Sequence, residues 1–256
     1  MHGWQSFILG GTCDSLPRGE NVSFGSALMN DRRTRQFLLY GVLAIGFLLP
    51  VVNSVGVVLG WFRLHTATQG RLFFRVIFQV AGLLSLYFAL KYQGRKLKDI
   101  GFVIEPRLRE IGHAFALFFG VLFLSVVLYF VLSPFIPGLQ GALHTTYDRA
   151  ALFGIRVGFL TLLWVILNSF HEELLVRAFL ITEMRGLYHS TLLAVMVSVS
   201  LQTSYHLYQG LPAALSHIPT FLVFSLYYVR THRILPVILA HLLLDLSALA
   251  VYATHH

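Results

Sequence analysis

The chain has 256 residues, of which 56% are hydrophobic and only 12% are charged, and its mean hydropathy is +0.72. Soluble domains carry about a quarter charged residues, so this composition predicts an integral membrane protein built as one compact bundle. The net charge of +8 does not indicate a nucleic-acid partner, because no basic stripe with interleaved aromatic residues occurs. In a membrane protein, an excess of basic residues usually marks cytoplasmic loops.

The N-terminal segment 1–35 is polar, and we interpret it as a cytoplasmic tail. Its apolar stretch WQSFILGG is too short for the core of a signal peptide. Cys13 is the single cysteine, which excludes an internal disulfide and the usual zinc-thiolate sites. The remainder, 36–256, is expected to form one membrane-embedded domain.

Apolar segments follow one another through this domain, and a span needs about 20 mostly apolar residues. The sequence therefore predicts an all-α polytopic bundle of seven to eight transmembrane helices, with an eighth if one segment is broken or re-entrant. The fourth span is expected to continue as helix through Arg177 and Phe179, partly along the membrane interface. The expected spans are 36–60, 72–91, 111–133, 151–171, 189–208, 211–229 and 234–253.

The Lys and Arg residues of the loops predict the orientation. With the N-terminus in the cytoplasm, fourteen Lys and Arg residues fall on the cytoplasmic side and five on the other. We therefore expect an N-terminus in the cytoplasm. The compact size of the chain favours a bacterial inner membrane. The loop 91–110 is either a basic amphipathic segment on the anionic inner leaflet or a solvated basic loop.

Two glutamates and an arginine interrupt the fourth span, in NSFHEELLVRAFL. A charged residue in the middle of a membrane helix costs roughly 2.5–3.5 kcal/mol, so such residues usually face the bundle interior and are functional. Glu173 and Arg177 are four apart in the favourable order for an ion pair, which predicts a structural role. Glu172 has no such partner and is left as a carboxylate for general-base chemistry. Alternatively, all three lie at the cytoplasmic water boundary.

Two later spans also carry polar residues. The stretch SLQTSYHLYQG places Gln202 one turn before His206, and ILAHLLLDLSAL places His241 and Asp245 four apart on one helix face. We expect Asp245 to orient or charge-stabilise the ring of His241. One carboxylate helix and two histidine helices could activate a water molecule in a buried polar cavity. His217 is a weaker candidate for the same site.

Several other chemistries lack their motifs. HEELL has leucine where the HExxH zinc helix needs its second histidine. No GxSxG, GxxxxGK[ST] or GxGxxG occurs, which argues against a serine hydrolase and against nucleotide binding. A transporter is disfavoured, because no pair of Gly/Pro-broken spans recurs in two halves.

The polar motifs resemble those of a known family. EELLVR fits EExxxR, QTSYH occupies the place of FxxxH, and HLLLD fits HxxxN/D. In this order, across 172–245, they resemble the CPBP family, which comprises CAAX prenyl endopeptidases and bacteriocin-processing (Abi) intramembrane proteases. The resemblance implies a helical bundle of about eight spans whose polar cavity opens toward the cytoplasmic leaflet.

The resemblance also implies roles for the motif residues. Glu172 and His206 would activate water to attack a peptide carbonyl, and His241 with Asp245 would stabilise the oxyanion. The supporting residues Glu173 and Arg177 would brace the site.

The chain departs from the family pattern at two positions. Gln202 stands at the Phe position, where it adds a hydrogen bond near His206 or reshapes the substrate groove. Asp245 stands where some members have Asn, and we expect it to hold His241 as a hydrogen-bond donor.

The expected function is that of an intramembrane glutamic endopeptidase, a hydrolase acting on a membrane-anchored or lipidated peptide or protein. No cofactor is expected; zinc bound by Glu172, His206 and His241 is the alternative. The alternative function is a non-proteolytic scaffold or immunity protein of the same fold. The presence of Glu172, His206 and His241 favours the enzyme, because a scaffold has no need of buried charge.

Overall fold

The computed structural model describes residues 32–63, 65–104, 108–134, 150–154 and 157–254. All regular secondary structure within these ranges is helical, which confirms the predicted all-α class. The predicted tail 1–35 lies outside the described residues except at its end, where the first helix already begins at Arg32.

Six helical segments are long and apolar enough to cross a membrane. Five lie close to predicted spans; the predicted fifth span is α10, which has 16 residues and is too short to count among the six. The first candidate span comprises α2 (Arg32–Leu43), η1 (Ala44–Leu48) and α3 (Leu49–Val58), and the fourth comprises α8 (Phe159–Glu172), η3 (Glu173–Phe179) and α9 (Leu180–Tyr188). The second, third and sixth are single helices, namely α4 (Gln69–Tyr92), α5 (Leu108–Leu132) and α13 (Leu235–Ala253), and the fifth comprises α11 (Leu211–Ser216) and α12 (Ile218–Thr231). The remaining elements are η2 (Leu97–Ile100), α7 (Ala150–Phe153), α10 (Thr191–His206) and η4 (Leu207–Gln209).

The fourth span differs from the prediction in position. The expected start at 151 falls in the separate short helix α7, and the long helix begins at Phe159 and runs without a break to Tyr188. It is the most buried of the six candidate spans. The prediction that this span continues as helix through Arg177 and Phe179 is confirmed, and other helices cover this second half.

Local sequence signals explain several helix ends. Thr68 and Ser190 cap α4 and α10 by accepting a hydrogen bond from a backbone N–H three residues later. His189 and His232 end α9 and α12 in the left-handed conformation, at φ 52° and 51°. Prolines occupy the first turn of α11, α12 and α13, where their missing N–H costs no helical hydrogen bond.

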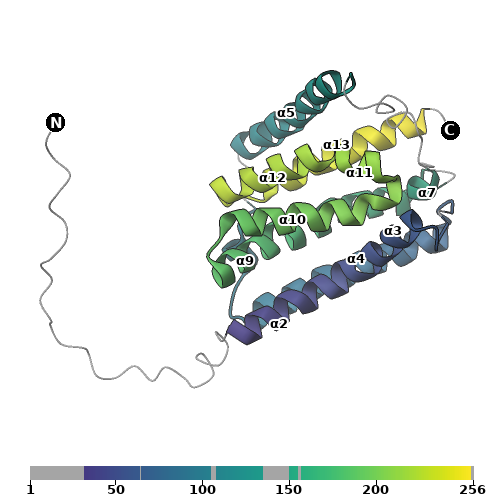
Figure 1. Cartoon of the computed structure of the whole chain (residues 1–256). Helices are drawn as coiled ribbons and strands as arrows, with labels where there is room; N and C mark the ends of the chain where they lie inside the picture. The colour runs from purple at the N-terminus through teal and green to yellow at the C-terminus, as the bar shows by residue number, and fades with distance from the viewer. Residues whose placement is uncertain (1–31, 64, 105–107, 135–149, 155–156, 255–256) are drawn as a thin grey trace, which may run out of the picture.

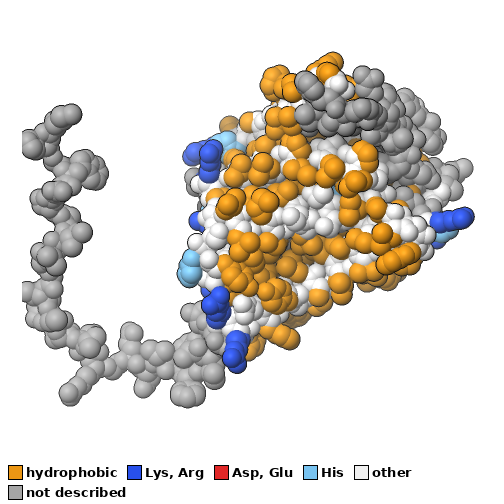
Figure 2. Space-filling view, viewed as in Figure 1, with side chains coloured by type: hydrophobic (Ala, Val, Ile, Leu, Met, Phe, Trp, Pro, Cys, Tyr) orange, Lys and Arg blue, Asp and Glu red, His pale blue; other side chains and the backbone are white. Residues whose placement is uncertain are grey.

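The helices lie side by side, from α2 and α4 at one edge through α10 and α12 to α5 at the other (Figure 1). The core is apolar and includes Leu175, Phe179 and Phe224, each at most 1% exposed. The outer faces are apolar too: Phe88 and Phe123 are 60% and 73% exposed. Figure 2 shows hydrophobic side chains covering the sides of the helices, with Lys and Arg at their ends. The molecule is an integral membrane protein.

Candidate active site

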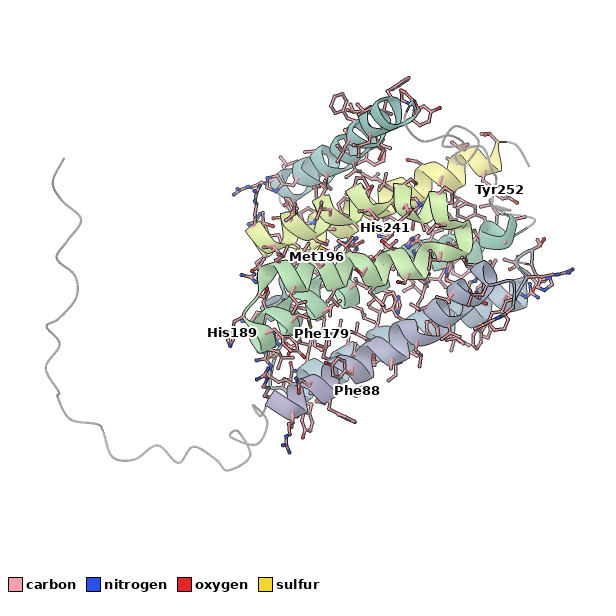
Figure 3. All side chains as sticks on the ribbon, viewed as in Figure 1. Phe88, Phe179, His189, Met196, His241 and Tyr252 are labelled. Atoms are coloured by element: carbon pink, nitrogen blue, oxygen red, sulfur yellow. The ribbon has the colours of Figure 1, made fainter. Side chains whose placement is uncertain are left out.

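A cavity of about 400 Å³ lies inside the bundle. Its walls come from α5, α7, α8, η3, α10, η4, α11, α12 and α13. Figure 3 shows His241 of α13 in the interior of the bundle. Six of the predicted site residues line the cavity, namely Glu172, Glu173, Arg177, His206, His241 and Asp245.

The EExxxR motif crosses a change of helix type. Glu172 is the last residue of α8, and Glu173 begins η3, a seven-residue π-helix that ends at Phe179. Such π segments are rare and are often found at functional sites. Spacing on an α-helix predicts that Glu172 and Glu173 face different ways, but both line the cavity.

Glu173 is the centre of a charged cluster. Its carboxylate accepts hydrogen bonds from Arg177 Nη1 at 2.6 and 2.7 Å, which is the ion pair that the spacing predicts. It also contacts Nδ1 of His241 at 2.6 Å, which the sequence analysis did not anticipate. The Arg177 guanidinium stacks over Phe221 and Phe224, 5.5 Å from each ring centre. Glu173 therefore links α13 to η3 as well as pairing with arginine.

Glu172 is 1% exposed and is held by neutral donors. Its Oε1 accepts from Asn168 Nδ2 at 3.0 Å, and its Oε2 accepts from Gln202 Nε2. Among the residues that the structure describes, no cation forms an ion pair with Glu172. Two hydrogen bonds from side-chain amides therefore fix the orientation of this carboxylate without neutralising it.

The residue at the Phe position of the second motif, Gln202, is fully buried. Its side-chain Nε2 donates to Glu172, and its side-chain oxygen accepts from Arg177 Nη1 at 3.2 Å. The sequence predicts that this amide either adds a hydrogen bond near His206 or reshapes the substrate groove. The hydrogen bonds of the amide instead join the two halves of the EExxxR motif.

The sequence analysis missed two residues of this network. Asn168 donates to Glu172 and accepts from Gln79 Nε2 of α4 at 2.9 Å, and both amides are buried. Asn168 lies four residues before Glu172, hence on the same face of α8. That spacing, and the isolated amide of Gln79 within an apolar span, were the signals that could have identified them.

His206 lies at the end of α10, and Nδ1 of its ring is 2.8 Å from the backbone carbonyl of Gln202. A carbonyl only accepts hydrogen bonds, so this contact places a proton on Nδ1 and leaves Nε2 as the acceptor of a neutral ring. The ring centre is 5.0 Å from that of Phe221 and 5.4 Å from that of His217. His206 is thus oriented as a base with its free nitrogen unprotonated.

His241 and Asp245 lie on one face of α13, as predicted. Nε2 of the ring is 3.6 Å from Asp245 Oδ2, which is longer than a hydrogen bond. The ring of His241 is oriented instead by the hydrogen bond between its Nδ1 and the carboxylate of Glu173. Asp245 is 30% exposed in its side chain, whereas Glu172 and Glu173 are buried.

His217, the weaker sequence candidate, also lines the cavity. Nε2 of its ring is 2.9 Å from the side-chain oxygen of Gln209. Tyr205 and Tyr208, which the sequence analysis did not single out, form part of the same wall.

The zinc alternative needs Glu172, His206 and His241 as ligands, and all three side chains line the cavity. Nδ1 of His206 faces a carbonyl and Nδ1 of His241 contacts Glu173, so Nε2 is the ring nitrogen that either histidine could offer to a metal. Within the described ranges, no three His, Cys, Asp or Glu side chains are grouped so that they could hold a metal.

A buried carboxylate and two histidines around a polar cavity, within an apolar bundle, form the kind of site expected of a membrane-embedded hydrolase. Residues 154–247, which contain all three motifs, match the family model described as Rce1-like, type II CAAX prenyl endopeptidase Rce1-like. This match confirms the resemblance to the CPBP/CAAX protease family. No curated protein and no solved structure was found to match the chain. The family suggests a CAAX-type intramembrane protease.

Proposed function

We propose that this protein is an intramembrane endopeptidase that hydrolyses a peptide bond of a membrane-anchored or lipidated protein, with water activated by glutamate and histidine. The observation that carries the proposal is the meeting of Glu172, His206 and His241, from three separate helices, at one cavity. Buried ionisable groups in a membrane bundle are costly, so their convergence on one cavity favours a chemical role.

Water activation is assigned to Glu172 and His206. Each oxygen of Glu172 accepts one hydrogen bond and retains a lone pair for a water proton. Nε2 of His206 accepts a second hydrogen bond from the same water. The water oxygen attacks the carbonyl carbon while its proton passes to Glu172. That proton then goes to the departing nitrogen, so that the products are an amine and a carboxylic acid, and the acid becomes a carboxylate when it releases the second proton of the water to solvent.

Oxyanion stabilisation is assigned to His241. Glu173 fixes the ring through Nδ1, which leaves Nε2 directed toward Asp245 without a hydrogen bond of normal length. Because Nδ1 already donates to Glu173, an Nε2–H is present when the ring is doubly protonated, and this Nε2–H can donate to the oxygen of the tetrahedral intermediate. The carboxylate of Asp245, 3.6 Å from Nε2, then stabilises positive charge on the ring of His241. We assign it a supporting role.

The mechanism needs no metal, so we expect strong chelators to leave cleavage unchanged. The measurement is the cleavage rate of the purified protein after treatment with a chelator, compared with the rate after added zinc. Loss of activity on chelation that zinc restores would contradict the metal-free mechanism.

The test of the function pairs Glu172→Gln with Glu183→Gln, since both glutamates are buried in the same continuous helix. The purified variants are placed in lipid vesicles with a library of membrane-anchored peptides, including a farnesylated peptide with a CAAX terminus, and products are read by mass spectrometry. Loss of the general base should slow cleavage roughly 10³-fold in Glu172→Gln. Equal amounts of folded Glu183→Gln protein should cleave at the normal rate.

The same experiment separates the enzyme from the scaffold. Cleavage by Glu172→Gln at the wild-type rate would refute the glutamate mechanism. A wild-type protein that cleaves none of the peptides, yet whose Glu172→Gln variant still supports its role in cells, would favour the scaffold.

A further inference from the structure

The two ends of the bundle differ strongly in charge. The starts of α2, α5, α10 and α13 and the ends of α4, α9 and α12 lie together at one end, which we call the basic end (Figure 1). The opposite end of the described chain carries only Arg63, Arg71 and Arg75. The basic end carries Arg32, Arg33, Arg35, Lys91, Arg95, Lys96, Lys98, Arg109, Arg185, Arg230 and Arg233.

This asymmetry predicts the orientation of the chain in the membrane. Lys and Arg next to the ends of transmembrane helices are retained in the cytoplasm, and the bias is counted over short loops such as those at the basic end. Acidic residues contribute little to this rule, so the pairs of Glu183 and Glu110 with arginines at this end do not weaken it. The basic end is therefore expected to face the cytoplasm.

The active-site cavity extends toward the other end. Its outer wall includes Tyr208, Gln209 and Ser216, in the turn and short helix that join α10 to α12, and Phe153 of α7. All of these elements lie at the end opposite the basic end (Figure 1). No residue of α9 or η2, which lie at the basic end, lines the cavity in the described chain.

Burial along the site agrees with this direction. Toward the basic end the helix is buried without lining the cavity: Val176, Phe179 and Leu180 are each at most 1% exposed. Toward the other end exposure rises: the His241 side chain is 11% exposed and that of Asp245 is 30% exposed. Water and substrate therefore reach Glu172 from the end that is poor in Lys and Arg.

We propose that the cavity is entered from the extracytoplasmic side of the membrane, so that the substrate is a membrane-anchored polypeptide whose cleavage site has already been translocated. The proposal rests on the proposed function. It conflicts with the cytoplasm-facing cavity that the family resemblance implies, because a cytoplasmic basic end and a cytoplasmic cavity exclude each other in this structure.

The cavity also constrains the form of the substrate. Glu172 is the fourteenth residue of α8, which places it about 20 Å along the helix from the start of α8. A folded domain cannot reach this depth, so the scissile bond must lie in an extended or unfolded segment. The polar side chains Gln209, Ser216 and His217 near the opening suit a peptide backbone, which needs hydrogen-bond partners once it leaves water.

Cysteine labelling in whole cells tests the orientation independently of activity. Cys13 is replaced by serine, and single cysteines are introduced as Ser216→Cys at the opening, Arg63→Cys at the same end and Lys98→Cys at the basic end. With a membrane-impermeant maleimide, the first two should be labelled in intact cells, and Lys98→Cys only after permeabilisation. A permeant maleimide serves as the control for thiol reactivity.

The reverse pattern, in which Lys98→Cys is labelled in intact cells and Arg63→Cys only after permeabilisation, would overturn the proposed orientation. Labelling of Arg63→Cys but not of Ser216→Cys in intact cells, with Ser216→Cys reached only after permeabilisation or not at all, would overturn the outward opening of the cavity.

A pair of reporters tests the substrate side. Both carry the best peptide from the library test beside one membrane anchor, and they differ only in whether this segment is cytoplasmic or extracytoplasmic. The extracytoplasmic reporter should be cleaved, and Glu172→Gln should abolish its cleavage. Cleavage of the cytoplasmic reporter alone would refute this inference while supporting the protease. Cleavage of neither reporter would refute the proposal for cells, and the vesicle assay would then show whether the protease function fails as well.

Discussion

Glu172 and Glu183 lie in the same continuous helix and are equally buried, at 1% and 0% exposure, but they have different partners. Glu183 pairs with two arginines, with Arg35 Nε at 3.0 Å and with Arg95. Among the described residues, the side-chain partners of Glu172 are the amides of Asn168 and Gln202. Two cations pair with the first carboxylate, whereas in the described chain no cation pairs with the second. In this protein, the partners of a buried acid distinguish the two roles better than its burial does.

The surroundings of the two arginines of Glu183 support a structural role for this site. Their side chains are 23% and 24% exposed, at the basic end of the helices. They come from α2 and from the loop after α4, so the cluster joins three parts of the bundle. Arg177, in contrast, is 1% exposed and lies within the active site.

The largest expected effect separates these two kinds of arginine. Arg177→Met leaves Glu173 buried beside His241 without its main cation, and breaking a fully buried pair costs about 3–5 kcal/mol. Arg95→Met leaves Glu183 paired with Arg35 at a partly exposed site, and should cost less than about 1 kcal/mol. The measurement is thermal unfolding of both variants in detergent, followed by fluorescence. Equal melting temperatures of the two variants would show that Arg177 and Arg95 contribute equally to stability, which would contradict the prediction.

A smaller effect is expected from the bridging amide. Gln202→Leu removes the donor to Glu172 and the acceptor of Arg177, and a hydrogen bond to a charged group contributes about 1.5–3 kcal/mol. We expect kcat to fall roughly 10- to 100-fold. The control is Thr203→Val, whose hydroxyl bonds only to the carbonyl of Val199 within the same helix. Unchanged kcat in Gln202→Leu would show that Glu172 needs no amide from α10.

The smallest effect is expected one step further from the cavity. Gln79→Leu removes the donor to Asn168 without touching the cavity wall. A neutral hydrogen bond contributes about 0.5–1.5 kcal/mol, so kcat should fall roughly two- to tenfold while KM stays constant. Ser85→Ala, on the same helix, should leave both unchanged, since its hydroxyl bonds to the carbonyl of Gly82. A change confined to KM would place Gln79 in substrate binding instead.

The sequence predicted the features that depend on a single helix. Runs of apolar residues gave the candidate spans, and i to i+4 spacing gave the pair of Glu173 with Arg177 and placed His241 and Asp245 on one face. Residues 151–158 misled the prediction of the fourth span: their hydropathy is continuous with α8, but the short helix α7 is separate from it. Hydropathy averages over such breaks.

Relations between helices were harder to predict. The contact of Glu173 with His241 joins residues 68 apart in sequence, and that of Gln79 with Asn168 joins residues 89 apart. They depend on the rotation and axial position of each helix, which no local pattern encodes. The π-helix at 173–179 directly follows Glu172, and no feature of the sequence indicated it.

By itself, the sequence determined that this is a helical membrane protein with its ionisable residues in three motifs, because hydropathy and helical spacing are properties of short segments. Only the tertiary structure decided that Glu172 is held by amides while Glu173 joins Arg177 to His241, and that the cavity opens away from the basic end. The physical reason is that hydrogen-bond partners and access to water are set by the packing of helices distant in sequence.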